Sequence, residues 1–326
     1  MLKISKRLIV VPDLLFDYIS DSFIILARMF SEKINGKVIK YSDFDPNQHT
    51  DIVFSMGAPS RTFDGSKFWH LKTKLFVYWI DDMGWKNPER RADFRKTIER
   101  ADLILCVNPV KFSLLWDKYL DKIAYFPFYA PDYFLADAPN AYPIMKCLLA
   151  GRLAIGQNTT VYPIRQKVFH AQMPEIEVLP HPTTTQSGIE KQKFAEELAK
   201  YFCCVTDSHR TYYDFIQDEN IHSYFNNIEK AKKQGQVVKK YFEIPATGSL
   251  LIADGNTEEE MKKLGFQNGQ NYIQVTEENV LDVIAEVLKN PEKYQAIRQE
   301  GLQFIKNNHR LMHREKLFSQ IMSAYV

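Results

Sequence analysis

The stretch VVKKYFEIPATGSLLIADG, residues 237–255, ends in an apolar run that is entered through a glycine and left through Asp-Gly. This short continuous run, Ser249–Ile252, predicts a strand buried on both faces of a parallel sheet. The part before it places Lys239, Lys240 and Glu243 in a segment of otherwise half-buried character. Buried charges are retained mainly where they are paired or used, so the stretch indicates both a fold class and a place to look for a site.

The spacing of Lys240 and Glu243 permits two interpretations. In a short helix or turn before the strand, residues three apart lie on one face. A cation there would neutralise a diphosphate and a carboxylate would accept hydrogen bonds from ribose hydroxyls, which suits a nucleotide sugar. The same spacing also fits a local ion pair worth about a few tenths of a kcal/mol and without function. Spacing alone leaves both interpretations open.

Outward from this stretch, strand-like and helix-like segments alternate in both halves of the chain. The strand-like runs are continuously apolar rather than alternating, which predicts an α/β fold with parallel sheets. Residues 276–326 form a helical tail with breaks at Asn290-Pro291 and Asn307-Asn308. The predicted strands are RLIVVPD, KVIKY, DIVFSMG, KLFVYWIDD, DLILCVN and KIAYFPF in residues 7–128, and IMKCLLAGR, EIEVLPH, YFCCVTD, GSLLIAD and NYIQV in residues 144–275.

Length and composition predict a globular protein of two domains. The chain has 326 residues, more than a single core usually holds. Residues 129–143, rich in Pro, Ala and Asp, break both periodicities and predict an interdomain linker. We therefore expect an N-terminal domain over 1–135, a C-terminal domain over 136–308, and a final helix over 309–326 that packs back on the first domain.

Charge and cysteine usage exclude some classes of function. A net charge of +2 is too small to indicate nucleic-acid binding. The four cysteines lack metal-ligand spacing and lie in apolar runs, so we expect buried thiols in a reducing compartment. The basic N-terminus has too short an apolar stretch for a signal peptide, and no stretch approaches the roughly 20 apolar residues of a membrane span. These features predict a cytoplasmic protein.

The ends of the predicted strands supply the candidate binding residues, because parallel sheets bind ligands there. The dinucleotide fingerprint G-x-G-x-x-G and the P-loop are both missing, which disfavours nicotinamide and P-loop chemistry. Backbone at Gly151 and the guanidinium of Arg152 suit a phosphate, although a plain turn fits equally. The other strand-end candidates, each also explained as ordinary loop or helix content, are Arg165, Thr206, His209 and Arg210.

Carboxylates after another predicted strand are candidates for a general base. Asp81 and Asp82 follow the run KLFVYWI, and one of them would serve an inverting transfer; helix capping is the structural alternative. Other bases would be histidines, namely His170, His209 and His222. The Asp43–Asp45 sequence mimics a D-x-D metal motif, but Pro46 and its loop-like surroundings favour coincidence.

The stretch KKYFEIPATGSLLIADG resembles the pattern (Arg/Lys)-x-Phe-Glu-(Ile/Ala)-x-Ala-x-Gly followed by an apolar strand. This pattern is typical of GT-B glycosyltransferases, especially the CgeB-like group. The resemblance continues to Ile321, and VYWIDDMGW (77–85) and AYFPFYAPDYF (124–134) also resemble that family. It implies two Rossmann-like domains facing across a cleft, with closing C-terminal helices. By this resemblance Glu243 is the ribose ligand, Lys240 is the basic position before it, and Ala246 and Gly248 let backbone approach the donor.

The resemblance implies a glycosyltransferase that moves a sugar from a nucleotide sugar to a glycan or lipid-linked acceptor, without a metal or other cofactor. A lipid-linked acceptor would bring peripheral association with a membrane; no nucleic-acid partner is expected. The alternatives are a GT-B-fold sugar-nucleotide epimerase, whose acidic and histidine cluster is not recognisable here, and a non-catalytic nucleotide-sugar-binding protein.

Overall fold

The computed structural model describes residues 6–13, 21–56, 65–81, 88–150, 162–179, 191–208 and 234–325. The chain divides into two compact units, with the divisions between Pro127 and Phe128 and between His313 and Arg314. Of the described residues, those up to Pro127 and from Arg314 onward belong to unit 1, and those from Phe128 to His313 belong to unit 2.

Unit 1 is built on a six-stranded parallel sheet in the order β2-β1-β3-β4-β5-β6. Every residue of the central strand β4 is buried, which explains why its sequence LFVYWI is apolar throughout. The strands are β1 (Arg7–Val11), β2 (Lys37–Lys40), β3 (Ile52–Met56), β4 (Leu75–Ile80), β5 (Leu103–Cys106) and β6 (Ile123–Tyr125).

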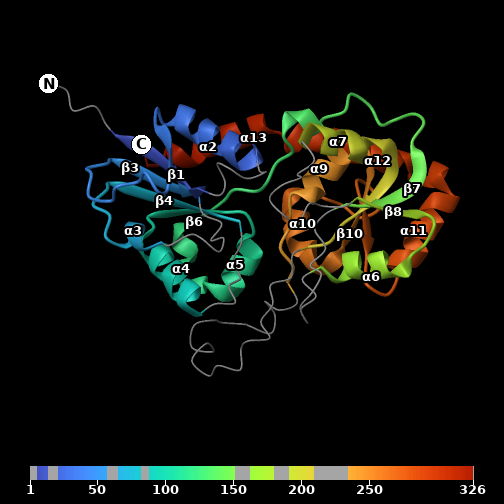
Figure 1. Cartoon of the computed structure of the whole chain (residues 1–326), viewed down its shortest axis with the longest axis horizontal. Coiled ribbons are helices and arrows are strands. Elements are labelled where there is room, and N and C mark those ends of the chain that lie inside the picture. The colour runs from blue at the N-terminus through green and yellow to red at the C-terminus, as the bar shows by residue number, and fades with distance from the viewer. Residues whose placement is uncertain are drawn as a thin grey trace. The chain divides into compact units, whose positions relative to one another are not determined.

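Helices cover both faces of the unit 1 sheet (Figure 1). One face is covered by α2 (Asp21–Lys33) and α13 (Leu311–Met322), where Phe30 and Phe318 pack with ring centroids 4.5 Å apart. The Nε of buried Arg314 donates to the Pro127 carbonyl at 3.0 Å, which also ties α13 to this unit. The other face is covered by α3 (Ser66–Trp69), α4 (Pro88–Arg100) and α5 (Pro109–Leu115), and η1 (Asp117–Lys122) leads into β6.

Unit 2 is built on a five-stranded parallel sheet in the order β11-β10-β9-β7-β8. Both halves of the chain therefore have the predicted α/β parallel architecture. The strands are β7 (Ile144–Leu149), β8 (Ile176–Val178), β9 (Tyr201–Val205), β10 (Leu250–Asp254) and β11 (Ile273–Val275).

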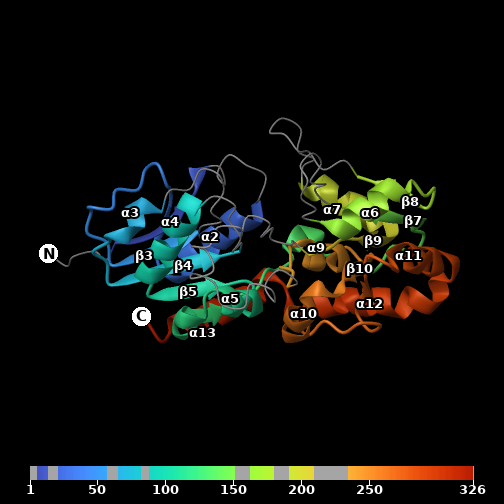
Figure 2. The same ribbon diagram turned by 90° about the horizontal axis from the view of Figure 1, so that it is seen from below.

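The helices of unit 2 bury apolar faces on this sheet. In α11, Val280, Ile284 and Val287 recur at helical spacing and are fully buried in the core with Ile164 and Val168 of α6. Helix α9 lies beside β10 in the views of Figure 1 and Figure 2 and also packs against α12. The helices are α6 (Pro163–Ala171), α7 (Lys191–Lys200), α9 (Lys240–Ala246), α10 (Glu258–Leu264), α11 (Val280–Lys289) and α12 (Pro291–Asn308), with short turns η2 (Asp132–Phe134) and η3 (Gly255–Thr257).

Residues 129–143, the stretch expected to be a linker, are bonded into unit 2. The Ala136 N–H donates to the Ala246 carbonyl at 2.9 Å, at the end of α9. The Lys306 side chain of α12 donates to the Asp137 carbonyl at 2.7 Å. These two hydrogen bonds to its backbone groups fix the segment on the helices of unit 2, although its sequence has neither helical nor strand periodicity.

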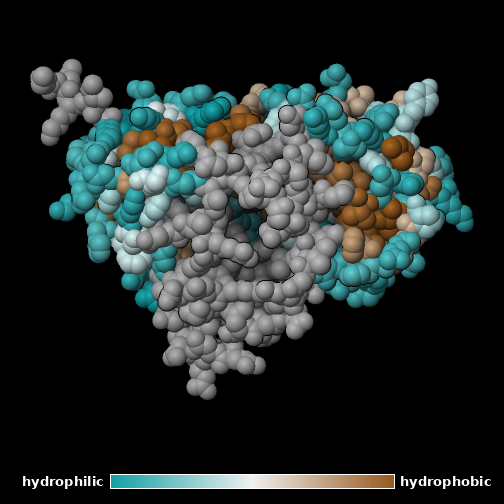
Figure 3. Space-filling model, in the orientation of Figure 1, coloured by the Kyte–Doolittle hydropathy of each residue, from teal (hydrophilic) through white to brown (hydrophobic). Residues whose placement is uncertain are grey.

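The four cysteines are free and buried, as the sequence predicts. Hydrophilic residues predominate among the described residues on the face drawn in Figure 3, with apolar patches over each unit. Across the described ranges, no helix combines the length and the apolar composition needed to cross a bilayer.

Candidate functional site

The candidate site lies at the carboxyl ends of the central strands of unit 2. Val205, the last residue of β9, pairs with Ile252 of β10 and with Leu149 of β7. The residues that follow β9, 206–208, therefore lie beside Asp254 at the end of β10. Ligands of open parallel sheets bind at this edge.

Arg165 and Thr206, two predicted donor-binding residues, belong to one buried cluster around Asp207. The Arg165 Nε lies 2.9 Å from Asp207 Oδ1, and its Nη2 donates to Thr206 Oγ1 at 2.7 Å. The backbone N–H groups of Ile164 and Arg165 donate to Asp207 Oδ2 at 2.9 and 3.3 Å. Asp207 thus caps the first turn of α6 from a neighbouring strand. Arg165 is 3% exposed, and the geometry shows a structural role for it; donor contact stays a prediction.

Opposing influences act on the Asp207 carboxyl. Burial, the largest of them, and the nearby Asp254 carboxylate raise its pKa, whereas Arg165 and the two backbone N–H groups lower it. The net result is a pKa raised to about 7. The edge of the sheet therefore holds two carboxyl groups that share a low-dielectric environment.

The segment before β10 forms α9, so Lys240 and Glu243 lie one turn apart on the same helix. Their side chains form an ion pair, with Lys240 Nζ donating to Glu243 Oε2. The Lys240 Nζ also lies 4.1 Å from the centroid of the Phe194 ring. Within the part of the chain that the structure describes, nothing hydrogen-bonds Oε1 of Glu243. The pair fits the local interpretation and leaves one carboxylate oxygen for a further partner.

Ala246 and Gly248 end the helix and turn the chain into β10. Gly248 has φ of +77°, a left-handed conformation that favours glycine. A Cβ added to it would lie 2.8 Å from the Pro139 Cα. Ala246 is fully buried, and its carbonyl accepts the N–H of Ala136. Packing against residues 136–139 therefore explains why both residues are small. Close approach of their backbone to a donor stays a prediction.

Of the predicted general bases, Asp81 lies directly after β4 and is half-buried, at the carboxyl end of the unit 1 sheet. His170 is exposed near the end of α6. The remaining predicted residues lie outside the described ranges, namely Asp82, Gly151, Arg152, His209, Arg210 and His222.

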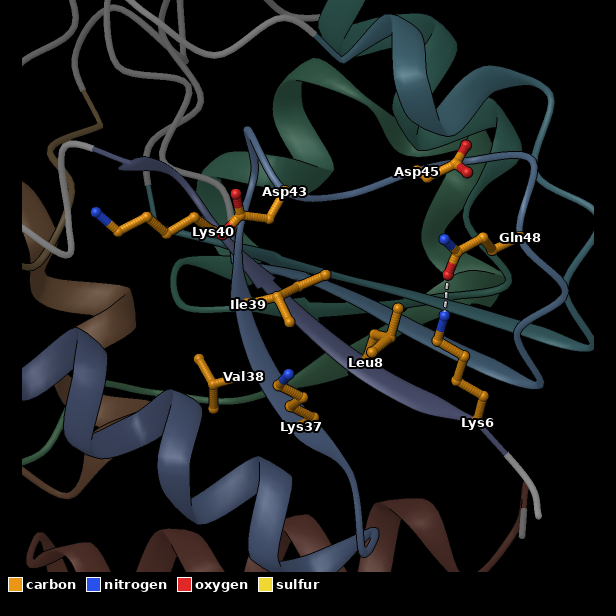
Figure 4. A pocket seen from close by; sticks show the side chains of 9 residues that line it. All are labelled: Lys6, Leu8, Lys37, Val38, Ile39, Lys40, Asp43, Asp45 and Gln48. Atoms are coloured by element: carbon orange, nitrogen blue, oxygen red, sulfur yellow. Dashed lines mark hydrogen bonds between the residues drawn. The ribbon is translucent and has the colours of Figure 1, made fainter.

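Asp43 and Asp45 of the D-x-D-like sequence line a groove on unit 1 (Figure 4). Its floor includes Leu8 and Ile39, and its other polar lining residues are Lys6, Lys37, Lys40 and Gln48. Lysines rather than further carboxylates thus accompany the two aspartates. Among the residues that the structure describes, no cluster of three or more His, Cys, Asp or Glu side chains could hold a metal ion.

Asp207 and Ser208 follow a predicted strand but are not among the predicted site residues, and neither are Tyr241 and Asp254. These four residues nevertheless form most of the polar contacts at this edge. The available signal was an Asp at the end of two apolar runs, YFCCVTD and GSLLIAD. It becomes informative only once the two strands are known to be neighbours.

Residues 205–321 match the family model described as glycosyl transferase-like. The match starts at the end of β9 and includes α9, β10 and the three C-terminal helices. No curated protein shows a significant match to the sequence.

Solved structures resemble nearly the whole chain. The Anabaena protein HepE with bound UDP-glucose superposes with a TM-score of 0.60 at 9% identity, covering 97% of this chain and 99% of that one. The chain has the GT-B fold. Sucrose-phosphate synthase from Thermosynechococcus elongatus gives a TM-score of 0.60 at 9% identity, covering 98% of this chain and 100% of that one. An alpha-glucosyltransferase in complex with UDP and DNA gives a TM-score of 0.62 at 13% identity, covering 98% of this chain and 100% of that one. The predicted fold class is confirmed; the CgeB-like subgroup stays a prediction.

Proposed function

We propose that the protein is a glycosyltransferase that moves a sugar from a nucleotide sugar to a glycan or lipid-linked acceptor without a bound metal. The observation that carries this proposal is the glycosyl transferase-like match over residues 205–321, which contains Asp207 and the Lys240–Glu243 pair. The GT-B fold supports it, and neighbours solved with UDP or UDP-glucose make a uridine donor the first to test.

Glu243 is the proposed ribose ligand. Lys240 neutralises Oε2, while Oε1 has no hydrogen-bond partner among the described residues. A carboxylate oriented in this way accepts hydrogen bonds from the ribose hydroxyls, and bonds to a charged acceptor are the stronger kind. Lys240 then contributes positive charge close to the nucleotide.

Stabilisation of the departing diphosphate is the main demand of the reaction. Asp207 already accepts the backbone N–H groups of Ile164 and Arg165, so the first turn of α6 has those donors occupied. The guanidinium of Arg165 is likewise paired with Asp207. Lys240 is also paired, with Glu243, but its side chain is 17% exposed and an ammonium has three N–H donors, so it is the cation that we propose for the donor. Asp81 or Asp82 is the proposed base if the transfer inverts configuration.

Glu243→Ala tests the donor site. We expect the dissociation constant for the donor to rise about tenfold or more, because a hydrogen bond to a charged group is worth about 1.5–3 kcal/mol. Calorimetry against UDP-, GDP-, dTDP- and CMP-sugars, with EDTA present, measures it. The matched control is Glu197→Ala, which removes another i,i+3 Glu–Lys pair in unit 2, at the end of α7 that leads into the start of β9.

The outcomes separate the possible functions. Binding of one nucleotide family, weakened in Glu243→Ala and unchanged in Glu197→Ala, supports the donor site. Binding with release of the nucleotide in the presence of an acceptor supports transfer; conversion of the donor sugar indicates an epimerase, and binding without turnover indicates a non-catalytic protein. Failure of the wild type to bind any of the four donors contradicts the proposal, and binding that EDTA abolishes contradicts its metal independence.

A further inference from the structure

Asp254, the last residue of β10, is the centre of a buried polar network. Its side chain accepts four hydrogen bonds although the residue is 1% exposed. Oδ1 accepts the Ser208 N–H at 3.0 Å and the Tyr241 hydroxyl at 2.5 Å. Oδ2 accepts the Ser208 hydroxyl at 2.6 Å and the Asn256 side-chain amide at 2.8 Å. A carboxylate with donors on both oxygens holds each of those donors in place.

The donors come from separate elements of the candidate site. Ser208 belongs to the loop after β9, which also carries the Asp207 cap. Tyr241 is the second residue of α9, next to Lys240 and two positions before Glu243. The Asp254 carboxylate therefore joins the turn that carries the Lys240–Glu243 pair to the loop at the neighbouring strand end.

The network is closely packed against the backbone at Gly235. A Cβ on Gly235 would lie 2.0 Å from Ser208 Oγ, and the Gly235 N–H donates to the Asn256 carbonyl at 2.9 Å. Burial and the Asp254 carboxylate raise the pKa of Tyr241, so its hydroxyl remains a donor at neutral pH. The backbone at Gly235 thus lies close against the Ser208 hydroxyl, and tight packing of this kind is what a supporting layer beneath a binding site requires.

We propose that Asp254 is a positioning residue for the donor site: through Tyr241 it holds the Lys240–Glu243 turn of α9 in register with the loop after β9. This inference rests on the proposed function, since it assigns the network to donor binding. A network that only stabilises the core would contribute to folding and leave the donor affinity of the folded protein unchanged.

Tyr241→Phe tests the inference, because it removes one hydrogen bond to Asp254 and keeps the ring. The probe is the nucleotide sugar that the wild type binds among UDP-, GDP-, dTDP- and CMP-sugars, titrated by calorimetry. We expect its dissociation constant to rise about fivefold or more, the lower end of the coupling between two sites. The matched control is Tyr119→Phe in unit 1, which also removes a hydroxyl bonded to a carboxylate, that of Glu99 at 2.8 Å.

A second measurement reports the position of the helix directly. Hydrogen exchange of the peptide that covers residues 239–247 is expected to be faster in Tyr241→Phe than in Tyr119→Phe or the wild type. Ser208→Ala removes the hydroxyl bond from the loop to Asp254 and keeps the bond from the backbone N–H, so it is expected to weaken donor binding in the same direction.

The results distinguish this inference from the proposed function. If the wild type binds none of the four donors, the function fails and the inference fails with it. If the wild type binds and Tyr241→Phe binds equally well with unchanged exchange over 239–247, the function stands and the positioning role is overturned. Weaker binding and faster exchange in Tyr241→Phe, with neither in Tyr119→Phe, support it.

Discussion

At the scale of a single residue, the buried carboxyl of Asp207 makes the stability of the fold depend on pH. Its pKa is raised to about 7, above its ordinary value of 3.8. Between these two values the folded chain binds more protons than the unfolded chain, so the contribution of Asp207 to the free energy of unfolding falls as the pH rises from about 4 to about 7. We expect the wild type to lose stability relative to Asp207→Asn over this range, by at most about 1.4 kcal/mol per pH unit.

Urea unfolding of both proteins at several pH values between 4 and 8 measures this difference. Only the slope is compared, because Asp207→Asn also leaves Arg165 buried without its carboxylate and lowers stability at every pH. A wild type that gains stability relative to the variant as the pH rises would show that Arg165 and the backbone donors outweigh burial, and that the pKa is lowered.

Local and distant pairs differ in how far the sequence predicts them. Lys240 and Glu243 are three residues apart, so helical spacing offers their ion pair as one of two interpretations of the sequence, and the structure contains the pair. Arg165 and Asp207 are brought together by the order of the strands and have no local signal. The sequence likewise predicts only a turn at Asp254, and a site there becomes visible once β9 and β10 are known to be neighbours.

The turn between α9 and β10 gives a prediction at the scale of elements. Gly248→Ala places a Cβ 2.8 Å from the Pro139 Cα in a residue with φ of +77°. Gly269 has a similar φ of +75°, but a Cβ there meets nothing within 4 Å. Gly269→Ala should therefore cost about 1 kcal/mol for the backbone conformation alone, and Gly248→Ala should cost clearly more, since it adds a clash with backbone.

Thermal and denaturant unfolding of the two variants compare these costs. The difference between them isolates the contact of α9 and β10 with residues 136–143, because the conformational term is shared. Equal losses of stability in the two variants would mean that the segment around Pro139 moves away at no cost, and that it is not fixed on unit 2.

The sequence predicted the elements well where burial is continuous. Strand β4 is apolar along its whole length, and β10 is apolar up to Ala253, because helices cover both faces of each sheet. The breaks at Asn290-Pro291 and Asn307-Asn308 mark the start of α12 and its end. The fixed path of residues 129–143 was not predictable, because it depends on backbone bonds to α9 and α12 rather than on its own side-chain pattern.

At the scale of the whole molecule, the chain leaves unit 1 and returns to it. Length and the two runs of alternating elements predicted two α/β domains, and the GT-B fold confirms that class. The return is made by the last residues, since those from Arg314 onward belong to unit 1. Phe318 of α13 is fully buried there between Phe30 of α2 and Phe54 of β3, with ring centroids at 4.5 and 5.6 Å.

Phe318→Ala should therefore destabilise unit 1, although position 318 follows the sequence of unit 2. Removing a buried phenylalanine costs about 3–5 kcal/mol, so we expect faster hydrogen exchange in β1 and β3. The control is Leu302→Ala. Leu302 is fully buried in α12, which packs against β10 in unit 2, so this variant should accelerate exchange in β10 instead. If Phe318→Ala accelerates exchange equally in β10, the two sheets unfold as one cooperative body; separate responses show that each unit depends on its own core, and that the C-terminal helix stabilises the N-terminal one.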